Sequence, residues 1–404
     1  MNILQINSVL NTGSTGRIAE EIGMVLLEYG FGSYIAYGRT ARKSKSEVVR
    51  IGSDLDFKWH GIETRLFDRH GLASRKATRA FINEIKRINP DIIHLHNIHG
   101  YYLNYQLLFD YLAKADIPIV WTLHDCWTVT GHCSHFESIN CEKWRTGCFK
   151  CPQKREYPSS LLFDNSTKNW KLKREYFNKV RDLTIVPVSD WLSDLLKHSY
   201  LSDKKIHRIY NGIDLNIFQE KDKHILTEKY KLENKHVLLG VTGVWGKKKG
   251  LFDFQKLDEF IDHDKYQIIM VGLTPKQIES LPKSIIGISR TESVQELAEF
   301  YSLADLFLNL TYEDTFPTTN LEALGCGTPV LTYRTGGSIE AITPETGFIV
   351  EKGNIEAVLD AISVVTKNGK DYYSLACRKR AEENYNKEDR YQEYIDLYRE
   401  LLNQ

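Results

Sequence analysis

The chain has 404 residues, which is too long for a single compact core and suits two domains of about 200 residues each. Its 42% hydrophobic and 26% charged residues are those of an ordinary soluble globular protein. Lysine plus arginine balance aspartate plus glutamate at 53 each, so no overall field attracts nucleic acid and any anion site must be local.

Membrane and export signals are absent from the sequence pattern. No apolar run reaches the roughly 18 residues of a transmembrane helix, and no charged stretch followed by an apolar one marks a leader. We therefore expect a cytoplasmic protein. Basic stretches at residues 39–45 and 171–174 could touch anionic lipid at the inner face of a membrane, although a solvated surface is the simpler interpretation.

In the first half of the chain, short apolar runs alternate with helical patterns. A helix of about residues 17–29 follows the first run, and the Gly13-Ser-Thr-Gly16 turn lies between them. This alternation predicts βαβ units and a parallel sheet. The predicted strands are residues 3–6, 91–95, 118–123, 184–188 and 206–210.

The same alternation of apolar runs and helical patterns begins again after Asn211-Gly-Ile-Asp214. The predicted strands of the second half are residues 237–241, 267–271, 285–288, 306–310 and 329–332. The fold class is therefore α/β, with two Rossmann-like doubly wound domains, 1–212 and 213–386, and a hinge near 212–220. Ligands of such sheets bind beyond the carboxyl ends of the strands, which predicts a site in a cleft between two facing sheets. A helical pattern occupies residues 387–404.

Histidines follow two predicted strands of the first half. Thr122-Leu-His-Asp125 ends one strand, which places His124 at the rim of the sheet or leaves it as a capped surface residue. His94 and His96 lie on one face of another strand, and this spacing would allow both imidazoles to bind one metal ion. No carboxylate or cysteine lies in register with them, so we do not expect a metal there.

A cysteine-rich insert, residues 126–152, interrupts the alternation. It holds five of the seven cysteines, and the spacing Cys133-x7-Cys141-x6-Cys148-x2-Cys151 places four thiols in a 19-residue stretch. Without a secretion signal, such a cluster favours zinc over disulfides. The last Cys-x-x-Cys is a typical zinc half-site, but the first pair is spaced more widely than in a standard zinc ribbon. A structural zinc site and free thiols both stay open.

Two segments of the second half are suited to bind an anion. The loop Thr242–Gly250 holds Lys247, Lys248 and Lys249 after the first strand of that half, where a lysine cluster favours function over simple solvation. In Tyr312–Val330, we predict Thr315 as a helix N-cap with Pro317 in the first turn, and Gly325 and Gly327 in the turn out. Unpaired N–H groups would then lie beside Thr318, Thr319 and Asn320.

The second segment also carries two carboxylates, Asp314 and Glu322, with seven residues between them. This acidic–seven–acidic pattern resembles the motif of retaining glycosyltransferases of family 4, which have the two-domain GT-B fold. The resemblance implies that Asp314 faces the donor sugar and that Glu322 hydrogen-bonds the nucleotide ribose. It also implies that the backbone N–H groups between them bind the diphosphate. The family usually has Glu followed by Gly where this chain has Asp314 and Thr315, and Glu313 is the alternative first acid.

Other segments resemble the family in the same order along the chain. The resemblance implies that Gly13 and Gly16 approach a donor phosphate, that His124 contacts the donor sugar and that Lys249 binds the leaving diphosphate. Val244 stands where the family has an arginine, so Lys247 or Lys248 would supply that charge. Further donor contacts are expected from Arg290, in the loop where a base would sit, and from Phe316, for which core packing is the alternative. The family's terminal helix crosses back to the first domain, and we expect residues 387–404 to do the same.

The resemblance implies a hexosyltransferase that moves a sugar from a nucleoside-diphosphate donor to a hydroxyl of a saccharide or lipid-linked acceptor, with no metal required for the chemistry. Bacterial surface-polysaccharide synthesis is the family's common setting. His96 and His99 would shape the acceptor side, near the cysteine insert. The alternatives are a nucleotide-sugar epimerase of the same fold, a catalytically inactive relative, and a protein- or nucleic-acid-binding module built on the insert. The base, the sugar, the acceptor, the linkage and the oligomeric state cannot be read from the sequence.

Overall fold

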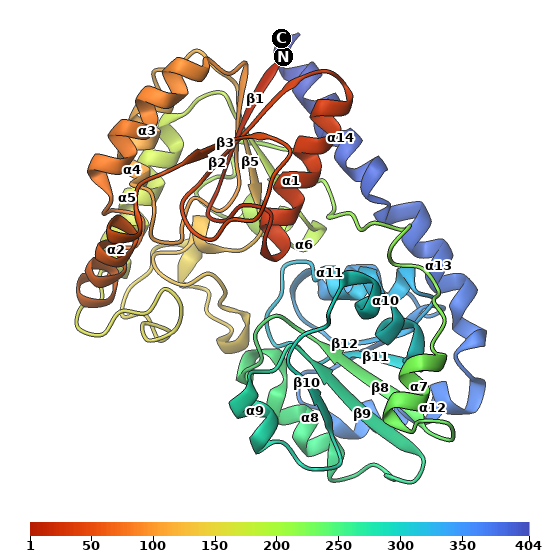
Figure 1. Cartoon of the computed structure of the whole chain (residues 1–404). Coiled ribbons are helices and arrows are strands. Elements are labelled where there is room, and N and C mark those ends of the chain that lie inside the picture. Colours follow the sequence, from red (N-terminus) through yellow and green to blue (C-terminus); the bar gives the residue numbers. More distant parts are fainter. Residues whose placement is uncertain (404) are drawn as a thin grey trace. The chain divides into compact units, whose positions relative to one another are not determined.

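The computed structural model describes residues 1–403 and divides into two compact units (Figure 1). The first unit contains Met1–Tyr210 together with residues from Tyr391 onward, and the second contains Asn211–Arg390. Each unit has one parallel β-sheet with helices around it, which is the α/β architecture that the alternation of runs predicted.

The sheet of the first unit has seven strands. They are β1 (Asn2–Asn7), β2 (Gly32–Tyr37), β3 (Glu47–Arg50), β4 (Ile92–Leu95), β5 (Ile119–Leu123), β6 (Leu183–Pro187) and β7 (Lys205–Ile206). Their order is β3-β2-β1-β4-β5-β6-β7, and all neighbours are parallel. Strands β4, β5 and β6 are buried along their whole length. Because helices cover both faces of such a strand, its sequence is a largely apolar run without polar alternation.

The helices of this unit cover both faces of its sheet. They are α1 (Gly13–Glu28), α2 (Asp54–Phe67), α3 (Arg75–Ile88), α4 (Tyr105–Leu112), α5 (Ser166–Lys179), α6 (Asp190–Lys197) and the larger part of α14 (Lys387–Leu402). In Figure 1, α1 and α14 lie on one side of the sheet, and α3, α4 and α5 lie on the other. The long connection from β5 to α5 holds the short 3-10 helices η1 (Trp127–Val129), η2 (Glu137–Ile139) and η3 (Lys143–Arg145).

Helix α14 is part of the core of the first unit, so the predicted crossing of the C-terminal helix back to the first domain is confirmed. Its buried residues pack with Ile18 and Ile22 of α1. Two tyrosine hydroxyls of α14 also reach the sheet. The Tyr398 hydroxyl lies 2.7 Å from Nδ1 of His94, and the Tyr394 hydroxyl lies 3.0 Å from the Thr122 hydroxyl.

The second unit has a six-stranded parallel sheet. Its strands are β8 (His236–Val241), β9 (Tyr266–Val271), β10 (Ile286–Ile288), β11 (Leu306–Asn309), β12 (Val330–Tyr333) and β13 (Gly347–Val350), in the order β10-β9-β8-β11-β12-β13. Its helices are α7 (His224–Tyr230), α8 (Leu251–Asp258), α9 (Pro275–Ser280), α10 (Val294–Leu303), α11 (Thr318–Gly325), α12 (Ile355–Asn368) and α13 (Asp371–Tyr385), with the 3-10 helices η4 (Lys247–Lys249) and η5 (Gly336–Ala341).

The sequence pattern and the structure differ mainly at or next to the edges of the sheets. Of the run predicted at 206–210 only Ile206 is in a strand, as the second residue of β7, and β2, β3 and β13 were not predicted. Strand β3 is largely exposed, so it has no apolar run that could mark it. The helix expected at about 17–29 begins earlier, at Gly13, and therefore includes the Gly-x-x-Gly segment in its first turn.

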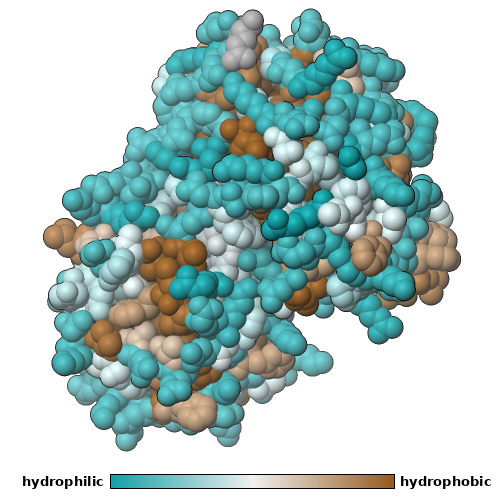
Figure 2. Space-filling view, turned by 180° about the vertical axis from the view of Figure 1, so that it is seen from behind, coloured by the Kyte–Doolittle hydropathy of each residue, from teal (hydrophilic) through white to brown (hydrophobic). Residues whose placement is uncertain are grey.

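No helix within residues 1–403 is long and apolar enough to cross a membrane. On the face in Figure 2, hydrophilic residues predominate and apolar residues form separate patches. The basic stretch 171–174 is less exposed than its sequence indicated, because Lys173 is buried and donates to the Trp127 carbonyl at 2.6 Å. Lys173 therefore does not contribute to a lipid-facing surface.

The hydroxyl of Tyr398 gives a first testable prediction. Tyr398→Phe leaves the buried Nδ1 of His94 without this partner, so we expect it to lower the free energy of unfolding by about 1–3 kcal/mol. Urea unfolding followed by tryptophan fluorescence suits the measurement, because Trp245 is the only one of the seven tryptophans outside the first unit. Tyr372→Phe, at an exposed site, is the control, and an equal loss in both variants would contradict the prediction.

Candidate functional site

The predicted anion-binding segments of the second unit meet at the centre of its sheet. Strands β8 and β11 are neighbours there. The strands that follow them in the sequence, β9 and β12, are added on opposite sides of this pair. Loops at such a switch point are the usual ligand site of an open parallel sheet. The lysine loop, residues 242–250, follows β8, and the acidic loop, residues 310–317, follows β11 and leads into α11.

Backbone contacts hold the lysine loop against the acidic loop. The Tyr312 N–H donates to the Lys248 carbonyl at 2.8 Å, and the Thr311 hydroxyl donates to the same carbonyl at 3.3 Å. Gly250 has φ +77°, and a Cβ atom at this position would lie 2.3 Å from the Leu310 carbonyl oxygen. Only glycine allows both this conformation and this approach.

Two ion pairs join the same loops. Nζ of Lys249 lies 2.6 Å from Oδ2 of Asp314 and donates to the Glu313 carbonyl at 3.1 Å, while Nζ of Lys248 lies 2.9 Å from Oε2 of Glu313. The side chain of Glu313 is 3% exposed, whereas that of Asp314 is 20% exposed. A ligand can therefore reach Asp314 more readily than Glu313, which favours Asp314 as the first acid. Lys247 is exposed.

Helix α11 begins later than the sequence indicated, which corrects the predicted cap. Its N-cap is Pro317, not Thr315, and its first residue is Thr318. The reason is local: Oδ1 of Asp314 accepts a hydrogen bond from the Phe316 N–H at 3.2 Å, and this turn delays the helix. Proline has no side-chain acceptor, and no side chain caps this end of α11, which has the positive end of the helix dipole.

The polar residues within α11 are buried. Nδ2 of Asn320 donates to the Ser338 carbonyl at 3.0 Å, and its Oδ1 accepts from Asn309 at 2.7 Å, so Asn320 connects α11 to η5 and β11. Oε2 of Glu322 accepts a hydrogen bond from the Tyr301 hydroxyl at 2.8 Å, and Glu322 is 4% exposed. Thr318 and Thr319 are partly exposed and lie at the start of the helix.

Two predicted donor contacts are not exposed side chains of this group. The ring of Phe316 is 3% exposed and packs with its centroid 5.8 Å from that of Tyr385, which favours the core interpretation of this residue. Arg290 is exposed and follows β10, which is separated from β8 by β9. The structure therefore brings Lys249 and Asp314 together in the loops beside α11, whereas the Phe316 ring packs in the core of the unit and Arg290 follows the edge strand β10.

The first unit has its own switch point, between β1 and β4. Gly13 is the first residue of α1 with φ +63°, and a Cβ on Gly16 would lie 3.1 Å from Cγ2 of Val9. Gly16 thus allows α1 to begin close to the turn after β1. The N-cap residue, Thr12, makes no side-chain capping hydrogen bond. The predicted phosphate segment is therefore a helix N-terminus.

Two histidines of the first unit, His96 and His124, form a buried hydrogen-bonded chain with Gln5. Nε2 of His124 lies 3.2 Å from Nδ1 of His96, whose Nε2 lies 3.0 Å from Oε1 of Gln5. Burial lowers the pKa of His94 to about 3 and, against the opposing effect of Asp125, the pKa of His124 to about 4. Near neutral pH, His124 can therefore offer a hydrogen bond but no charge.

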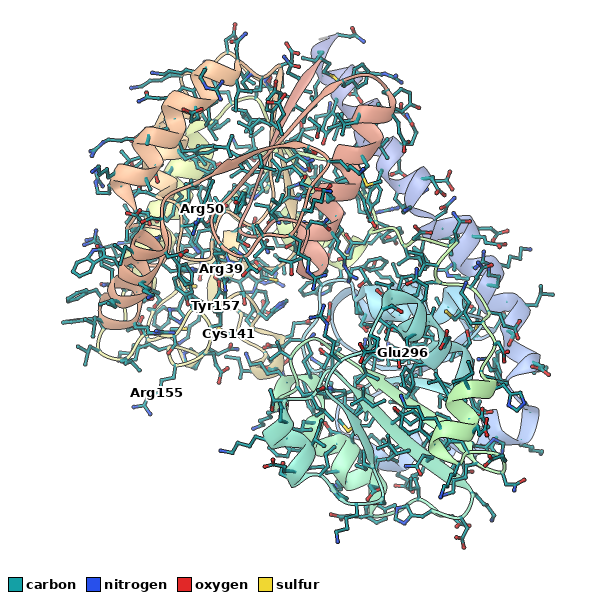
Figure 3. The ribbon with its side chains drawn as sticks, viewed as in Figure 1. Arg39, Arg50, Cys141, Arg155, Tyr157 and Glu296 are labelled. Carbon is teal, nitrogen blue, oxygen red and sulfur yellow. The ribbon has the colours of Figure 1, made fainter. Side chains whose placement is uncertain are left out.

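A second polar group surrounds Asp125. Nε2 of His99 lies 2.8 Å from Oδ2 of Asp125, and Nδ1 of His99 lies 3.2 Å from the hydroxyl of Tyr157, which is labelled in Figure 3. Burial by itself would raise the pKa of Asp125, but the adjacent His99 lowers it to about 2. Sequence reasoning missed Tyr157, because 58 residues separate it from His99 and no spacing connects them.

Gly13, Gly16 and His124 belong to the first unit, whereas Lys249, Asp314 and Glu322 belong to the second. As the side chains stand, residues 1–403 contain no group of three or more His, Cys, Asp or Glu residues placed to hold a metal ion.

Two family models match the chain, one in each half. The model described as Glycosyltransferase Family 4 matches residues 26–217, and the model described as Glycosyl transferases group 1 matches residues 236–368.

Curated relatives match over part of their length. The putative colanic acid biosynthesis glycosyl transferase WcaC of Escherichia coli is 28% identical over 234 residues, covering 53% of this chain and 55% of that protein. The capsular polysaccharide biosynthesis glycosyltransferase CapM of Staphylococcus aureus is 25% identical over 232 residues, covering 52% of this chain and 61% of that protein. The matched region thus spans about three fifths or less of these relatives.

Solved structures match over the whole chain. The sucrose-phosphate synthase of Thermosynechococcus elongatus has a TM-score of 0.75 at 16% identity, with 99% of this chain and 98% of that chain covered. HepE of Anabaena, solved in complex with UDP, has a TM-score of 0.70 at 14% identity, with 98% and 99% covered. At these identities the likeness shows the fold, which is the expected GT-B fold.

The close approach at Gly250 gives a second prediction. Gly250→Ala forces a Cβ into contact with the Leu310 carbonyl at a left-handed φ, so we expect it to lower the melting temperature, with a loss of stability above about 1 kcal/mol. Gly246→Ala is the matched control, because Gly246 has extended backbone and nothing lies within 4 Å of its added Cβ. Calorimetry of both variants is the measurement. Equal melting temperatures would contradict this account of the loop contact.

The buried histidines give a third prediction. The unfolded chain binds protons at histidine below about pH 6.5, whereas folded His94 and His124 bind them only near pH 3 and pH 4. Stability should therefore fall as pH drops below about 6.5, by up to about 1.4 kcal/mol per pH unit for each histidine. Urea midpoints at pH 7 and pH 5 measure this, and His124→Gln should reduce the slope. Midpoints that do not depend on pH would contradict it.

Proposed function

Because the chain belongs to the family 4, group 1 glycosyltransferases, we propose that it moves a sugar from a nucleoside-diphosphate donor to a hydroxyl of a saccharide or lipid-linked saccharide acceptor. The proposed enzyme is a hexosyltransferase that retains the anomeric configuration. The names of two relatives refer to colanic acid and capsular polysaccharide biosynthesis, which supports surface-polysaccharide synthesis as the setting. A lipid-linked acceptor would bring the protein to the inner face of a membrane, where the basic stretch 39–45 could meet anionic lipid.

The observation that carries this proposal is the pair of Lys249 and Asp314, 2.6 Å apart, at the start of α11. The pair lies in the two loops that follow the central strands β8 and β11, where an open parallel sheet binds its ligands. A cation and a helix N-terminus suit a diphosphate, and a carboxylate beside them suits the hydroxyls of a sugar. A nucleoside-diphosphate sugar requires both kinds of contact at neighbouring positions.

Charge develops on the diphosphate as the sugar leaves. Lys249, assisted by Lys247 or Lys248, stabilises that charge together with the N–H groups at Thr318 and Thr319, which is the electrostatic term that usually dominates catalysis. As the resemblance to family 4 implies, the proposed step requires no metal. No residue stands out as a covalent nucleophile, so the proposed route is a front-face displacement. The acceptor hydroxyl attacks on the face from which the diphosphate leaves, and the departing diphosphate takes its proton.

The remaining residues position the donor. In the proposal, Asp314 bonds the sugar hydroxyls, Glu322 bonds the ribose, and Arg290 lies near the base. In the first unit, Gly13 and Gly16 let backbone N–H groups approach a phosphate, and His124 contacts the donor sugar. HepE was solved with UDP, which supports a nucleoside diphosphate as the ligand class for this chain.

A thermal-shift screen with UDP, GDP and ADP tests donor binding, and at least one nucleotide should raise the melting temperature. Lys249→Ala should abolish that shift and reduce turnover about a hundredfold, because it removes the charge that stabilises the leaving diphosphate. Lys265→Ala is the matched control. Lys265 lies in the same unit, but it directly precedes β9 and is therefore at the amino ends of the strands, away from the proposed site. Its side chain is 71% exposed.

Product analysis separates the alternatives. A transferase releases the nucleotide in proportion to the acceptor consumed, whereas an epimerase converts the sugar without an acceptor and keeps the nucleotide attached. An inactive relative binds the nucleotide but releases no sugar from any donor. If no nucleotide shifts the melting temperature, or if Lys249→Ala behaves like Lys265→Ala, the assigned site is wrong.

A further inference from the structure

Four cysteines of the segment between β5 and α5 line one small cavity. Its volume is about 10 Å³, and Cys133, Cys141, Cys148 and Cys151 all contribute to its wall. Aromatic side chains close it, and the rings of Phe136 and Trp144 are stacked with centroids 5.3 Å apart. Cys141 is labelled in Figure 3. A space of this size accommodates a single small atom or ion and no organic ligand.

The thiols already have the surroundings that metal-bound sulfurs use. The side chains of Cys133 and Cys151 are hydrogen-bonded to each other, and the Gly131 N–H donates to Sγ of Cys148 at 3.2 Å. The buried imidazole of His132 also lines the cavity, and its Nδ1 lies 2.6 Å from Oδ1 of Asp68. Hydrogen bonds to the ligand atoms are typical of the groups that surround metal ligands.

The segment has little regular structure of its own. Residues 124–165 form three short 3-10 helices and no strand, all within the described chain. Its contacts to the rest of the first unit include Lys173, which donates to the carbonyls of Trp127 and Thr130, and Trp170, whose Nε1 donates to the Trp144 carbonyl at 2.9 Å. Segments with so few ladder hydrogen bonds are commonly held together by a metal or by disulfides.

We propose that Cys133, Cys141, Cys148 and Cys151 bind one zinc ion as a structural site. Zinc prefers four thiolates in a tetrahedron, with Zn–S distances of about 2.3 Å. As the side chains stand, the four sulfurs are not at coordination distance. Binding therefore requires rotation about the Cα–Cβ bonds, which brings the sulfurs toward the cavity. Each thiol releases a proton as its sulfur bonds the ion, and no electrons are transferred.

Charge and accessibility favour a structural role over a catalytic one. Zinc with four thiolates has a net charge of −2, and the buried Lys173, which interacts electrostatically with Cys133 and Cys148, would offset part of it. Four protein ligands leave no open position for a substrate or a water molecule. The site is independent of Lys249 and Asp314, so it can be tested without reference to the proposed transfer reaction.

The test uses the full chain, expressed in zinc-containing medium and purified under reducing conditions. Elemental analysis should find one zinc per chain, and the cobalt-substituted protein should have the visible absorption of tetrahedral cobalt thiolate. Cys148→Ala should remove most of the zinc and this absorption. Cys126→Ala is the matched control, because Cys126 is buried in the same segment but does not line the cavity. It should keep both.

A thiol count on the unaltered chain gives an independent result if Cys148→Ala fails to fold. A chelator should make four further cysteines reactive to a thiol reagent and should lower the melting temperature of the first unit. Added zinc should reverse both changes. Chains that contain no zinc, that lose it without new reactive thiols, or that hold disulfides at these positions would overturn the proposal. Zinc retained in folded Cys148→Ala would also overturn it.

Discussion

The ammonium of Lys249 contacts the carboxylate of Asp314, 65 positions later in the sequence, and this contact joins two loops of the second unit. The sheet order creates this meeting, because β8 and β11 are neighbours and their loops leave from the same edge. Gly250 then allows the lysine loop to lie against the Leu310 carbonyl, which no larger residue at that position would permit. The proposed diphosphate site therefore depends on a backbone approach as much as on its charges.

In the first unit, buried polar groups determine how the helices attach to the sheet. Tyr394 and Tyr398 of α14 bring their hydroxyls to Thr122 and His94 on neighbouring strands. Such a network rigidifies a core only when each buried group has a partner, since an unpaired one costs about 1–3 kcal/mol. The same burial keeps His124 neutral near pH 7.

The cysteine insert departs from this scheme because it adds no strand and no α-helix. The residues between the insert and α5 reach the polar group at the end of β5, where Tyr157 contacts His99, which in turn contacts Asp125. A zinc ion held by the four cysteines would fix the insert, and through it the position of Tyr157. In this way a structural metal could influence the surface of the first unit without taking part in the transfer reaction.

The sequence by itself determined the features that depend on local pattern. Buried central strands appear as apolar runs, α14 appears as a helical repeat, and the segments around Lys249 and Asp314 lie directly after strands. Only the tertiary structure decided that Pro317 caps α11, that Phe316 packs on Tyr385, and which loops face each other. The physical reason is the distance along the chain over which each kind of interaction acts. Periodicity and capping act over a few residues, whereas burial, ion pairing and pKa shifts depend on neighbours that the chain brings together only when the sheets form.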